Sequence, residues 1–252
     1  MAIIWQKTIG DEKFEIRNAR SSVRLYTNGV FHSQFNPNQV LSKSIWDLLV
    51  LPIFFHPNGW AKRILILGVG GGTAIKLIHN FMQPEKIIGI ELSDTHLSLA
   101  KRFFRIKPSE AELVKADARA WLSDYEGPPF DLIIDDLFGH TDGETRRAVS
   151  LDSQWVTLLI KHMSKQGMLI VNTADLEEFN NSAFKRNKRI GQKFKSTFKL
   201  THPTCENRVY VFSRSEITRK ALKHNINLLS KSVVVKPLLE LADLSRQFAL
   251  TD

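Results

Sequence analysis

The sequence predicts an α/β fold in which a mostly parallel sheet with helices on both faces follows a small β-hairpin subdomain. Two observations carry this prediction. From residue 61 onward, short apolar runs alternate with helical stretches, which is typical of strands buried on both faces of a parallel sheet. Before that point, two strand-like runs are joined by Asn28-Gly29, a dipeptide that favours a two-residue hairpin turn.

The N-terminal subdomain is predicted over residues 1–58. Its hairpin pairs residues 22–27 with 30–35, and a helical stretch over about 38–55 follows. The sequence His-Pro-Asn-Gly at 56–59 then indicates a loop.

The central domain is predicted over residues 59–214, and a helical tail over 215–252. The last two strands of the central domain have a short connection around Pro203, which favours an antiparallel pair that closes one edge of the sheet. The tail contains an amphipathic basic helix and a more apolar segment. The expected strands are 64–67, 87–90, 112–114, 130–134, 168–171, 194–202 and 207–213; the expected helices are 73–82, 94–105, 150–163 and 215–229, and the apolar segment of the tail is 232–250.

The composition is that of an ordinary globular protein, with 252 residues, 43% hydrophobic and 24% charged. No apolar run reaches the roughly 18 residues of a membrane span, and the first residues lack the pattern of a signal peptide. Cys205 is the single cysteine, which excludes an internal disulfide and favours a reducing compartment. We therefore expect a cytoplasmic protein that does not enter a membrane.

The net charge of +9 raises the expectation of an acidic partner. The excess is concentrated in residues 185–199, which hold seven lysines and arginines and no acidic residue. This run could follow the phosphates of a nucleic acid. A solvated helix face is favoured instead, because no nucleic-acid-binding motif accompanies the run.

A glycine-rich loop follows the first strand of the central domain. The strand at 64–67 leads through Gly68-Val69-Gly70-Gly71-Gly72 into a helix that begins at Thr73. Glycines allow a sharp turn and the close approach of a ligand, and the helix N-terminus attracts an anionic group. A dinucleotide fingerprint has its third glycine where this chain has Thr73. The actual spacing, with glycines at 68, 70 and 72, is the spacing used for adenosylmethionine. The alternative is a tight turn that requires glycine for packing alone.

Two acidic residues follow the next two strands. Glu91 ends the strand at 87–90 and can accept hydrogen bonds from both ribose hydroxyls of an adenosine. Asp117 follows the run at 112–114 and can accept from an adenine amino group. Each could also be a surface carboxylate. Because the carboxyl ends of parallel strands meet at one edge of the sheet, glycine loop and acids together predict a nucleoside site.

The runs LILGVGGGTAIKLI, IIGIELSD, KADARAWL and FDLIIDDL resemble a class I methyltransferase fold of the spermidine synthase type, over about residues 22–172. The hairpin YTNGVFHSQF is similar to the small N-terminal β domain of those synthases. The resemblance implies a Rossmann-like, mostly parallel seven-stranded sheet with an antiparallel edge strand, S-adenosylmethionine as the ligand, and a homodimer. It also implies the ligand contacts: Gly68, Gly70, Gly72 and Thr73 along the cofactor, Glu91 at the ribose, Asp117 and Ala118 at the adenine, and Asp136 at the sulfonium end.

The chain departs from the spermidine synthase pattern at the positions that handle the amine. Gly71 stands where those synthases have an aspartate that contacts the aminopropyl group. Gly139 stands where they have a general-base aspartate, and His140 follows it in place of proline. Their tyrosine–histidine pair is also missing around residues 40–44.

These departures favour methyl transfer, because an attacking amine must be neutral and a diamine needs carboxylates to hold its distal cation. Methyl transfer depends mostly on alignment. We therefore expect an S-adenosylmethionine-dependent methyltransferase whose acceptor the sequence does not specify, with Asp136 and His140 as candidate proton acceptors and no metal site. Asp135 should point to the opposite side of the strand. Two alternatives stay open: a polyamine aminopropyltransferase using decarboxylated S-adenosylmethionine, and a non-catalytic module that binds an acidic partner.

Overall fold

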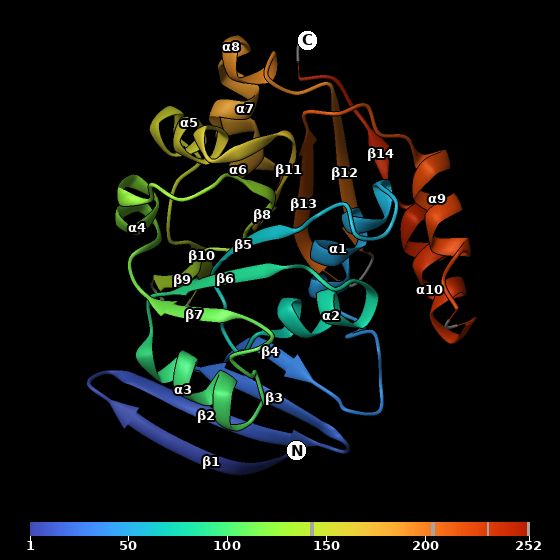
Figure 1. Cartoon of the computed structure of the whole chain (residues 1–252). Coiled ribbons are helices and arrows are strands. Elements are labelled where there is room, and N and C mark those ends of the chain that lie inside the picture. Colours follow the sequence, from blue (N-terminus) through green and yellow to red (C-terminus); the bar gives the residue numbers. More distant parts are fainter. Residues whose placement is uncertain (142–143, 203–204, 231, 251–252) are drawn as a thin grey trace.

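The computed structural model describes residues 1–141, 144–202, 205–230 and 232–250, with the side chains of 140–145 excepted. A four-stranded antiparallel sheet precedes a larger sheet that carries helices on both faces (Figure 1). The predicted α/β fold with a separate N-terminal β subdomain is confirmed.

The N-terminal sheet contains β1 (Ala2–Ile9), β2 (Glu12–Ala19), β3 (Ser22–Thr27) and β4 (Val30–Phe35), in that spatial order. The predicted hairpin is β3 and β4, and Asn28 and Gly29 have the positive φ angles, 50° and 82°, that its turn requires. The sequence did not predict β1 and β2. Strand β1 is exposed along nearly its whole length. Because neither of its faces is buried, its sequence does not show the alternation of apolar and polar residues that predicts a strand.

The segment after the hairpin holds a short α-helix, α1 (Ile45–Val50), and a 3₁₀ helix, η1 (Leu51–Phe55), instead of one helix over 38–55. Pro52 lies at the start of η1 and has no N–H to continue the hydrogen-bond ladder of α1. The α-helix therefore ends at Val50.

The large sheet has the strand order β14-β12-β13-β11-β8-β5-β6-β7. The five strands from β11 to β7 are parallel, and β13, β12 and β14 pair antiparallel at one edge, as predicted for the last two strands. The sheet has eight strands instead of seven because the tail supplies β14. The strands are β5 (Arg63–Leu67), β6 (Lys86–Glu91), β7 (Glu112–Lys115), β8 (Phe130–Asp135), β11 (Met163–Thr173), β12 (Ser196–His202), β13 (Cys205–Ser213) and β14 (Arg246–Gln247).

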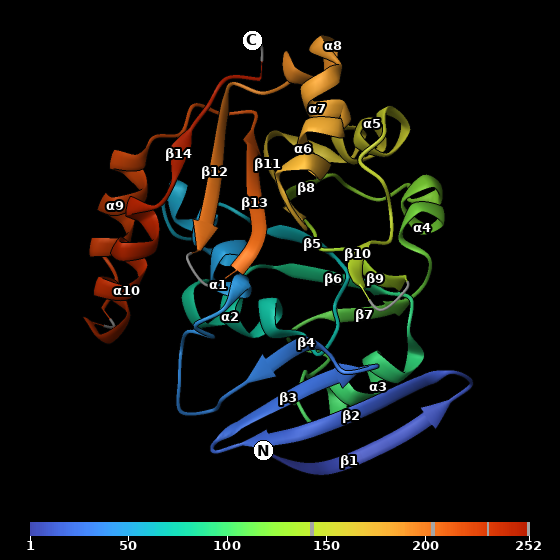
Figure 2. The same ribbon diagram turned by 180° about the vertical axis from the view of Figure 1, so that it is seen from behind.

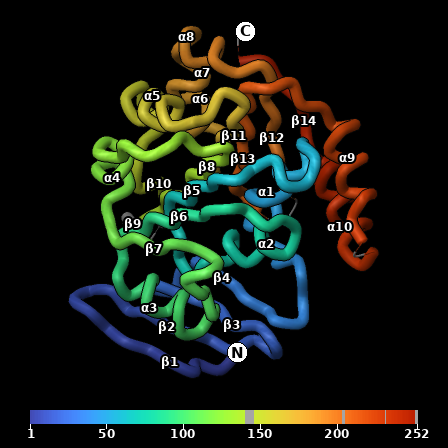
Figure 3. The backbone as a smooth tube through the Cα atoms, in the orientation of Figure 1, coloured from blue at the N-terminus to red at the C-terminus, as the bar shows by residue number. Residues whose placement is uncertain are grey.

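The helices lie on the two faces of this sheet, as Figure 2 shows from behind. A further hairpin, β9 (Phe138–Thr141) and β10 (Glu144–Arg147), follows β8. Figure 3 follows the chain from the N-terminal sheet to the tail helices beside β12 and β14. Among the described residues, no helix combines the length and the apolar character needed to cross a membrane. The helices are α2 (Thr73–Phe81), α3 (Asp94–Arg102), α4 (Ala118–Asp124), α5 (Ser153–Lys161), α6 (Leu176–Asn181), α7 (Ala183–Arg186), α8 (Lys188–Gly191), α9 (Arg219–Asn227) and α10 (Ser232–Asp243).

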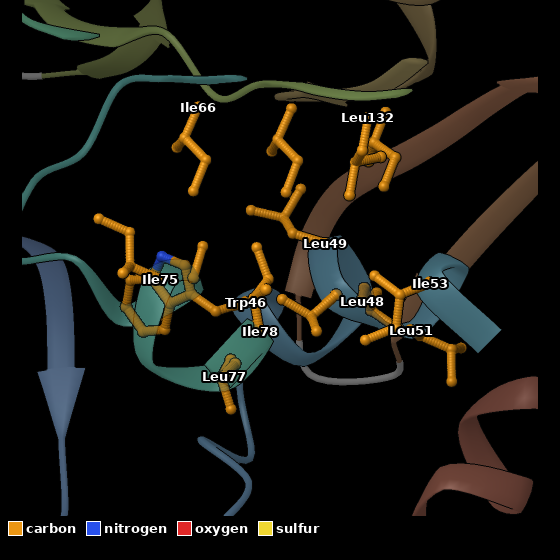
Figure 4. Packing of buried hydrophobic residues seen from close by; sticks show 14 of the residues in the cluster. Trp46, Leu48, Leu49, Leu51, Ile53, Ile66, Ile75, Leu77, Ile78 and Leu132 are labelled. Atoms are coloured by element: carbon orange, nitrogen blue, oxygen red, sulfur yellow. The ribbon is translucent and has the colours of Figure 1, made fainter. Parts of the chain in front are cut away.

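The core lies on both faces of the sheet. Ile64 and Ile66 of β5 join the cluster that includes α1, η1 and α2 (Figure 4), whereas Leu65 and Leu67 join the cluster on the other face, around Trp155 of α5. This division follows from the alternation of side chains along a strand. Burial on both faces explains why the central strands are continuous apolar runs in the sequence.

The basic run 185–199 spans α7, α8 and the start of β12 instead of one helix. Ala183, Phe184 and Ile190 are buried, while five of the seven cationic residues are exposed and two are half-buried. The exposed residues are Arg186, Lys188, Arg189, Lys193 and Lys195.

Candidate active site

The glycine loop turns sharply at three glycines. Gly68, Gly70 and Gly72 have φ angles of 87°, 53° and 85°, a region that side chains disfavour. A Cβ on Gly68 would also lie 2.2 Å from the backbone oxygen of Asp136. Contacts within the protein thus already require glycine at position 68, and they bring the loop against the end of β8.

The backbone N–H groups of the loop all donate within the protein. Gly68 donates to the Ile90 oxygen, and Val69 and Gly70 both donate to Oε2 of Glu91, at 3.1 and 2.8 Å. The Gly71 amide donates to the Ser33 hydroxyl at 2.7 Å, and the Gly72 amide to the Val69 oxygen at 2.8 Å. The loop therefore has no spare N–H from residue 68 to residue 72 for an anionic ligand group.

The position of Gly71 is packed instead of vacant. A Cβ there would lie 2.6 Å from the ring of Phe104, which is fully buried. Thr73 is buried too. Its hydroxyl donates to the backbone oxygen of Gln34 and accepts from the backbone N–H of the same residue. Phe104 and β4 thus occupy the space around Gly71 and Thr73.

Glu91 ends β6, at the predicted place, but its carboxylate faces the glycine loop. Besides the two loop amides, it accepts from the Ser93 amide at 2.9 Å and lies 3.6 Å from Nδ1 of His96. Burial acts to raise the pKa of Glu91, yet the His96 contact and the amides hold that pKa below its ordinary value. A carboxylate has about four acceptor positions, so ribose hydroxyls would have to share or replace these partners. The ribose contact stays a prediction.

Asp117 and Ala118 lie beside the end of β6, where the backbone N–H of Ala116 donates to the backbone oxygen of Glu91. Asp117 is exposed and caps α4 by accepting from the Ala120 amide at 2.8 Å, and Ala118 is buried. One carboxylate oxygen of Asp117 is thus committed to the cap. The adenine contact predicted for this pair is untested.

Asp136 lies directly after β8, between the glycine loop and β11. Its Oδ1 accepts from the side-chain amide of Asn172 at 2.7 Å. Burial raises the pKa of the Asp136 carboxyl to about 7, against the opposite effects of the Asn172 hydrogen bond and the Arg147 charge. Asp135 does point to the other side of the strand, where Arg147 and Trp155 bind it.

A cleft of about 880 Å³ lies beyond Asn172. The Asn172 side chain accepts from Asn207, which lines this cleft, at 3.2 Å. Four carboxylate side chains line it against two arginines, in a protein whose net charge is +9. The four acidic residues are Asp175, Glu177, Glu178 and Glu206.

The segment after Asp136 forms the hairpin β9–β10. Gly139 and His140 are consecutive residues of β9. The His140 side chain lies outside the described residues, so its predicted part in catalysis is untested.

The structure gathers the glycine loop, Glu91 and Asp136 at one edge of the sheet, with Asp117 beside the end of β6, and their contacts with a ligand stay predictions. Sequence reasoning missed Asn172, Asn207 and the acidic residues of the cleft. Asp175, Glu177 and Glu178 follow β11, so their position after a buried strand was a usable indication. Nothing in the sequence indicated that Asn207 and Glu206 reach the same cleft from β13.

A family described as "Methyltransferase domain" matches residues 64–153. Polyamine aminopropyltransferase 2 of Caldanaerobacter subterraneus is 27% identical over 149 residues, which cover 58% of this chain and 46% of that protein. The chain therefore spans about half the length of this relative.

Two solved structures resemble the whole chain. The spermidine synthase from Thermotoga maritima superposes with a TM-score of 0.67 at 18% identity, over 95% of this chain and 87% of that one. A probable spermidine synthase from Corynebacterium glutamicum gives a TM-score of 0.70 at 16% identity, over 96% and 95%. The protein has a spermidine synthase-like class I methyltransferase fold.

For this spermidine synthase-like chain, the expectation of methyl transfer is wrong. The curated relative is named as an aminopropyltransferase, so the comparisons favour the alternative that the sequence left open. The name of that relative is that of a transferase, which is the coarser class of enzyme expected above.

Proposed function

We propose that the protein transfers an aminopropyl group from decarboxylated S-adenosylmethionine to a linear amine. The observation that carries the proposal is Asp136, a carboxyl group with a pKa of about 7 that lies between the glycine loop and an acidic cleft. A proton acceptor is most effective when its pKa is near the working pH. The name of the Caldanaerobacter relative agrees with this reaction.

The bonding of the glycine loop supports a donor without a carboxylate. The backbone N–H groups of residues 68–72 are used inside the protein, so the loop itself offers no free donor to a ligand carboxylate. Decarboxylated S-adenosylmethionine ends in an ammonium group instead, which needs acceptors. Glu91 and Asp117, at the ends of β6 and β7, are the residues proposed to hold its nucleoside part.

The charge of the cleft supports a cationic acceptor. A net charge of +9 disfavours the approach of a polyamine to the protein. The acidic cleft provides local negative charge, because Glu177 and Glu206 are exposed and can hold the distal ammonium groups of a linear amine. Asp175 and Glu178 add to this charge, although their carboxylates also accept from the backbone amides of Glu178 and Ala174. Asn172 and Asn207 connect the cleft to Asp136 through hydrogen bonds of 2.7 and 3.2 Å.

In the proposed reaction, the lone pair of a neutral amine nitrogen attacks the aminopropyl carbon attached to sulfur. The C–N bond forms as the C–S bond breaks, and the bonding electron pair stays on sulfur, which gives methylthioadenosine. The nitrogen then releases a proton to the ionised carboxylate of Asp136. Asp136 thus acts as the base in this proposal, because position 139, where spermidine synthases have a general-base aspartate, is glycine here. The carboxylates that hold the amine come from the cleft.

The test is to incubate the protein with decarboxylated S-adenosylmethionine and putrescine, cadaverine or spermidine, and to measure methylthioadenosine. We expect turnover of about 1 per second or faster, with a rate that rises with pH through about 7 as Asp136 ionises. Asp136→Asn should reduce the rate by about 10² to 10⁴. Asp131→Asn, at the opposite end of β8, is the matched control and should retain it. Absence of product with every amine, or normal rates for Asp136→Asn, would refute the proposal.

The acceptor site has its own test. Glu177→Gln and Glu206→Gln should each raise the KM for the amine by about threefold, the size expected for an exposed ion pair, and leave the KM for the donor unchanged. Glu85→Gln is the control, since Glu85 is exposed and pairs with Lys62 away from the cleft. An unchanged KM for the amine in both cleft variants would mean that the acceptor binds elsewhere.

A further inference from the structure

A fully buried ion pair lies directly beneath the proposed proton acceptor. Asp135 has no exposed surface, and both of its oxygens accept from Nη2 of Arg147 at 2.8 Å. The indole N–H of Trp155 donates to the same carboxylate at 2.9 Å. Asp135 thus has partners from β10 and α5, although it belongs to β8.

Arg147 connects three parts of the site. Its side chain is 1% exposed, and it donates to the backbone oxygen of Asn172 at 2.7 Å and to that of Val149 at 3.2 Å. It therefore fixes the hairpin β9–β10 to the ends of β8 and β11. These two strand ends carry Asp136 and Asn172, the pair joined by the 2.7 Å hydrogen bond.

We propose that the buried Asp135–Arg147 ion pair positions Asp136 and sets the electric field at its carboxylate. Both residues are positioning residues, because neither faces the cleft with its charge free: Arg147 lines the cleft but its guanidinium is bound to Asp135. The inference rests on the proposed function for the part that Asp136 plays in catalysis.

The charges around Asp136 predict the direction in which its pKa changes when either member of the ion pair is removed. From β8 and β6, Asp135 and Glu91 disfavour its ionised form, and from β10 Arg147 favours it. Asn172 of β11 is neutral, and Glu178 of α6 lies 3.5 Å from Nε of Arg147. Removing one member of the ion pair therefore leaves the field of the other without compensation, and the two removals must act in opposite directions.

The experiment is a ¹³C NMR titration of the Asp136 carboxyl in the full chain, assigned by its loss in Asp136→Asn. Arg147→Gln should move the titration midpoint upward by about one pH unit, and Asp135→Asn should move it downward by a similar amount. The double variant should titrate near the wild-type value of about 7. Midpoints that move in the same direction in both single variants, or that do not move, overturn the inference.

Breaking a buried ion pair can prevent folding, so Arg147→Lys provides a second test. Lysine keeps the charge but cannot make the forked contact with Asp135. We expect a midpoint near that of the wild type, with kcat at least tenfold lower and the KM for the donor unchanged. An unchanged kcat refutes the positioning role. The titration needs no turnover, so an inactive wild-type protein would refute the proposed function and leave the NMR test of the ion pair intact.

Discussion

Replacing Asp136 by asparagine should stabilise the protein at neutral and alkaline pH. The ordinary pKa of an aspartate is 3.8, and burial raises that of Asp136 to about 7 in the folded protein. Between these values the native state holds a proton that the unfolded chain has lost, so the free energy of unfolding falls as pH rises through this window. Above about pH 7 the full cost is present.

The size of this effect follows from the two pKa values. A difference of one pKa unit corresponds to 1.36 kcal/mol, so the shift from 3.8 to about 7 sets an upper bound of about 4 kcal/mol. Asp136 is partly exposed, which reduces the cost. The Asn172 amide can still donate to the asparagine side-chain oxygen. We therefore expect Asp136→Asn to be more stable than wild type by about 2 to 4 kcal/mol at pH 9, and nearly equal in stability at pH 4.

The assay is urea unfolding of both proteins between pH 4 and pH 9, with tryptophan fluorescence as the signal. Asp131→Asn serves as the control, because Asp131 accepts backbone hydrogen bonds from Lys62 and Arg63 at the other end of the same strand. A stability difference between Asp136→Asn and wild type that does not change with pH would refute the argument, since the carboxyl would then titrate alike in the folded and unfolded chains.

Two further outcomes follow from the same site, and a third concerns the basic run 185–199. Glu91→Ala should weaken nucleoside binding and also lower the free energy of unfolding by about 3 kcal/mol or more, because it leaves three backbone amides without an acceptor. A nucleoside affinity measured by calorimetry and an unfolding free energy measured with urea that both equal those of the wild type would contradict this. Gly71→Ala should cost about 1 to 3 kcal/mol through its clash with Phe104, and Phe104→Leu in the same chain should recover part of it; equal stability of Gly71→Ala and wild type would show that the ring moves aside. If the run 185–199 binds nucleic acid, Lys188→Glu with Arg189→Glu should flatten the salt dependence measured by fluorescence anisotropy; no binding at low salt leaves a solvated surface.

The sequence pointed to the wrong reaction because the acids missing from two motif positions outweighed Asp136, which was already a candidate proton acceptor. Gly71 and Gly139 were interpreted as the loss of an anchor and a base. In the structure, burial raises the pKa of Asp136 to about 7, and burial is not visible in a single sequence. The carboxylates that we propose as anchors come from α6, its N-cap and β13, whose proximity depends on the strand order.

What the sequence determined by itself was local. Three local patterns predicted structure correctly: an apolar run followed by glycines, at 64–67, the Asn28-Gly29 turn, and acidic residues after buried strands. The φ angles that glycine and asparagine allow predict the two turns, and the common direction of parallel strands predicts that the acidic residues lie at one edge of the sheet. The tertiary structure alone decided that Ser33 and Phe104 close the glycine loop, that Glu91 turns towards its amides, and that Arg147 reaches Asp135. These contacts join residues far apart in the chain, and packing, not periodicity, selects them.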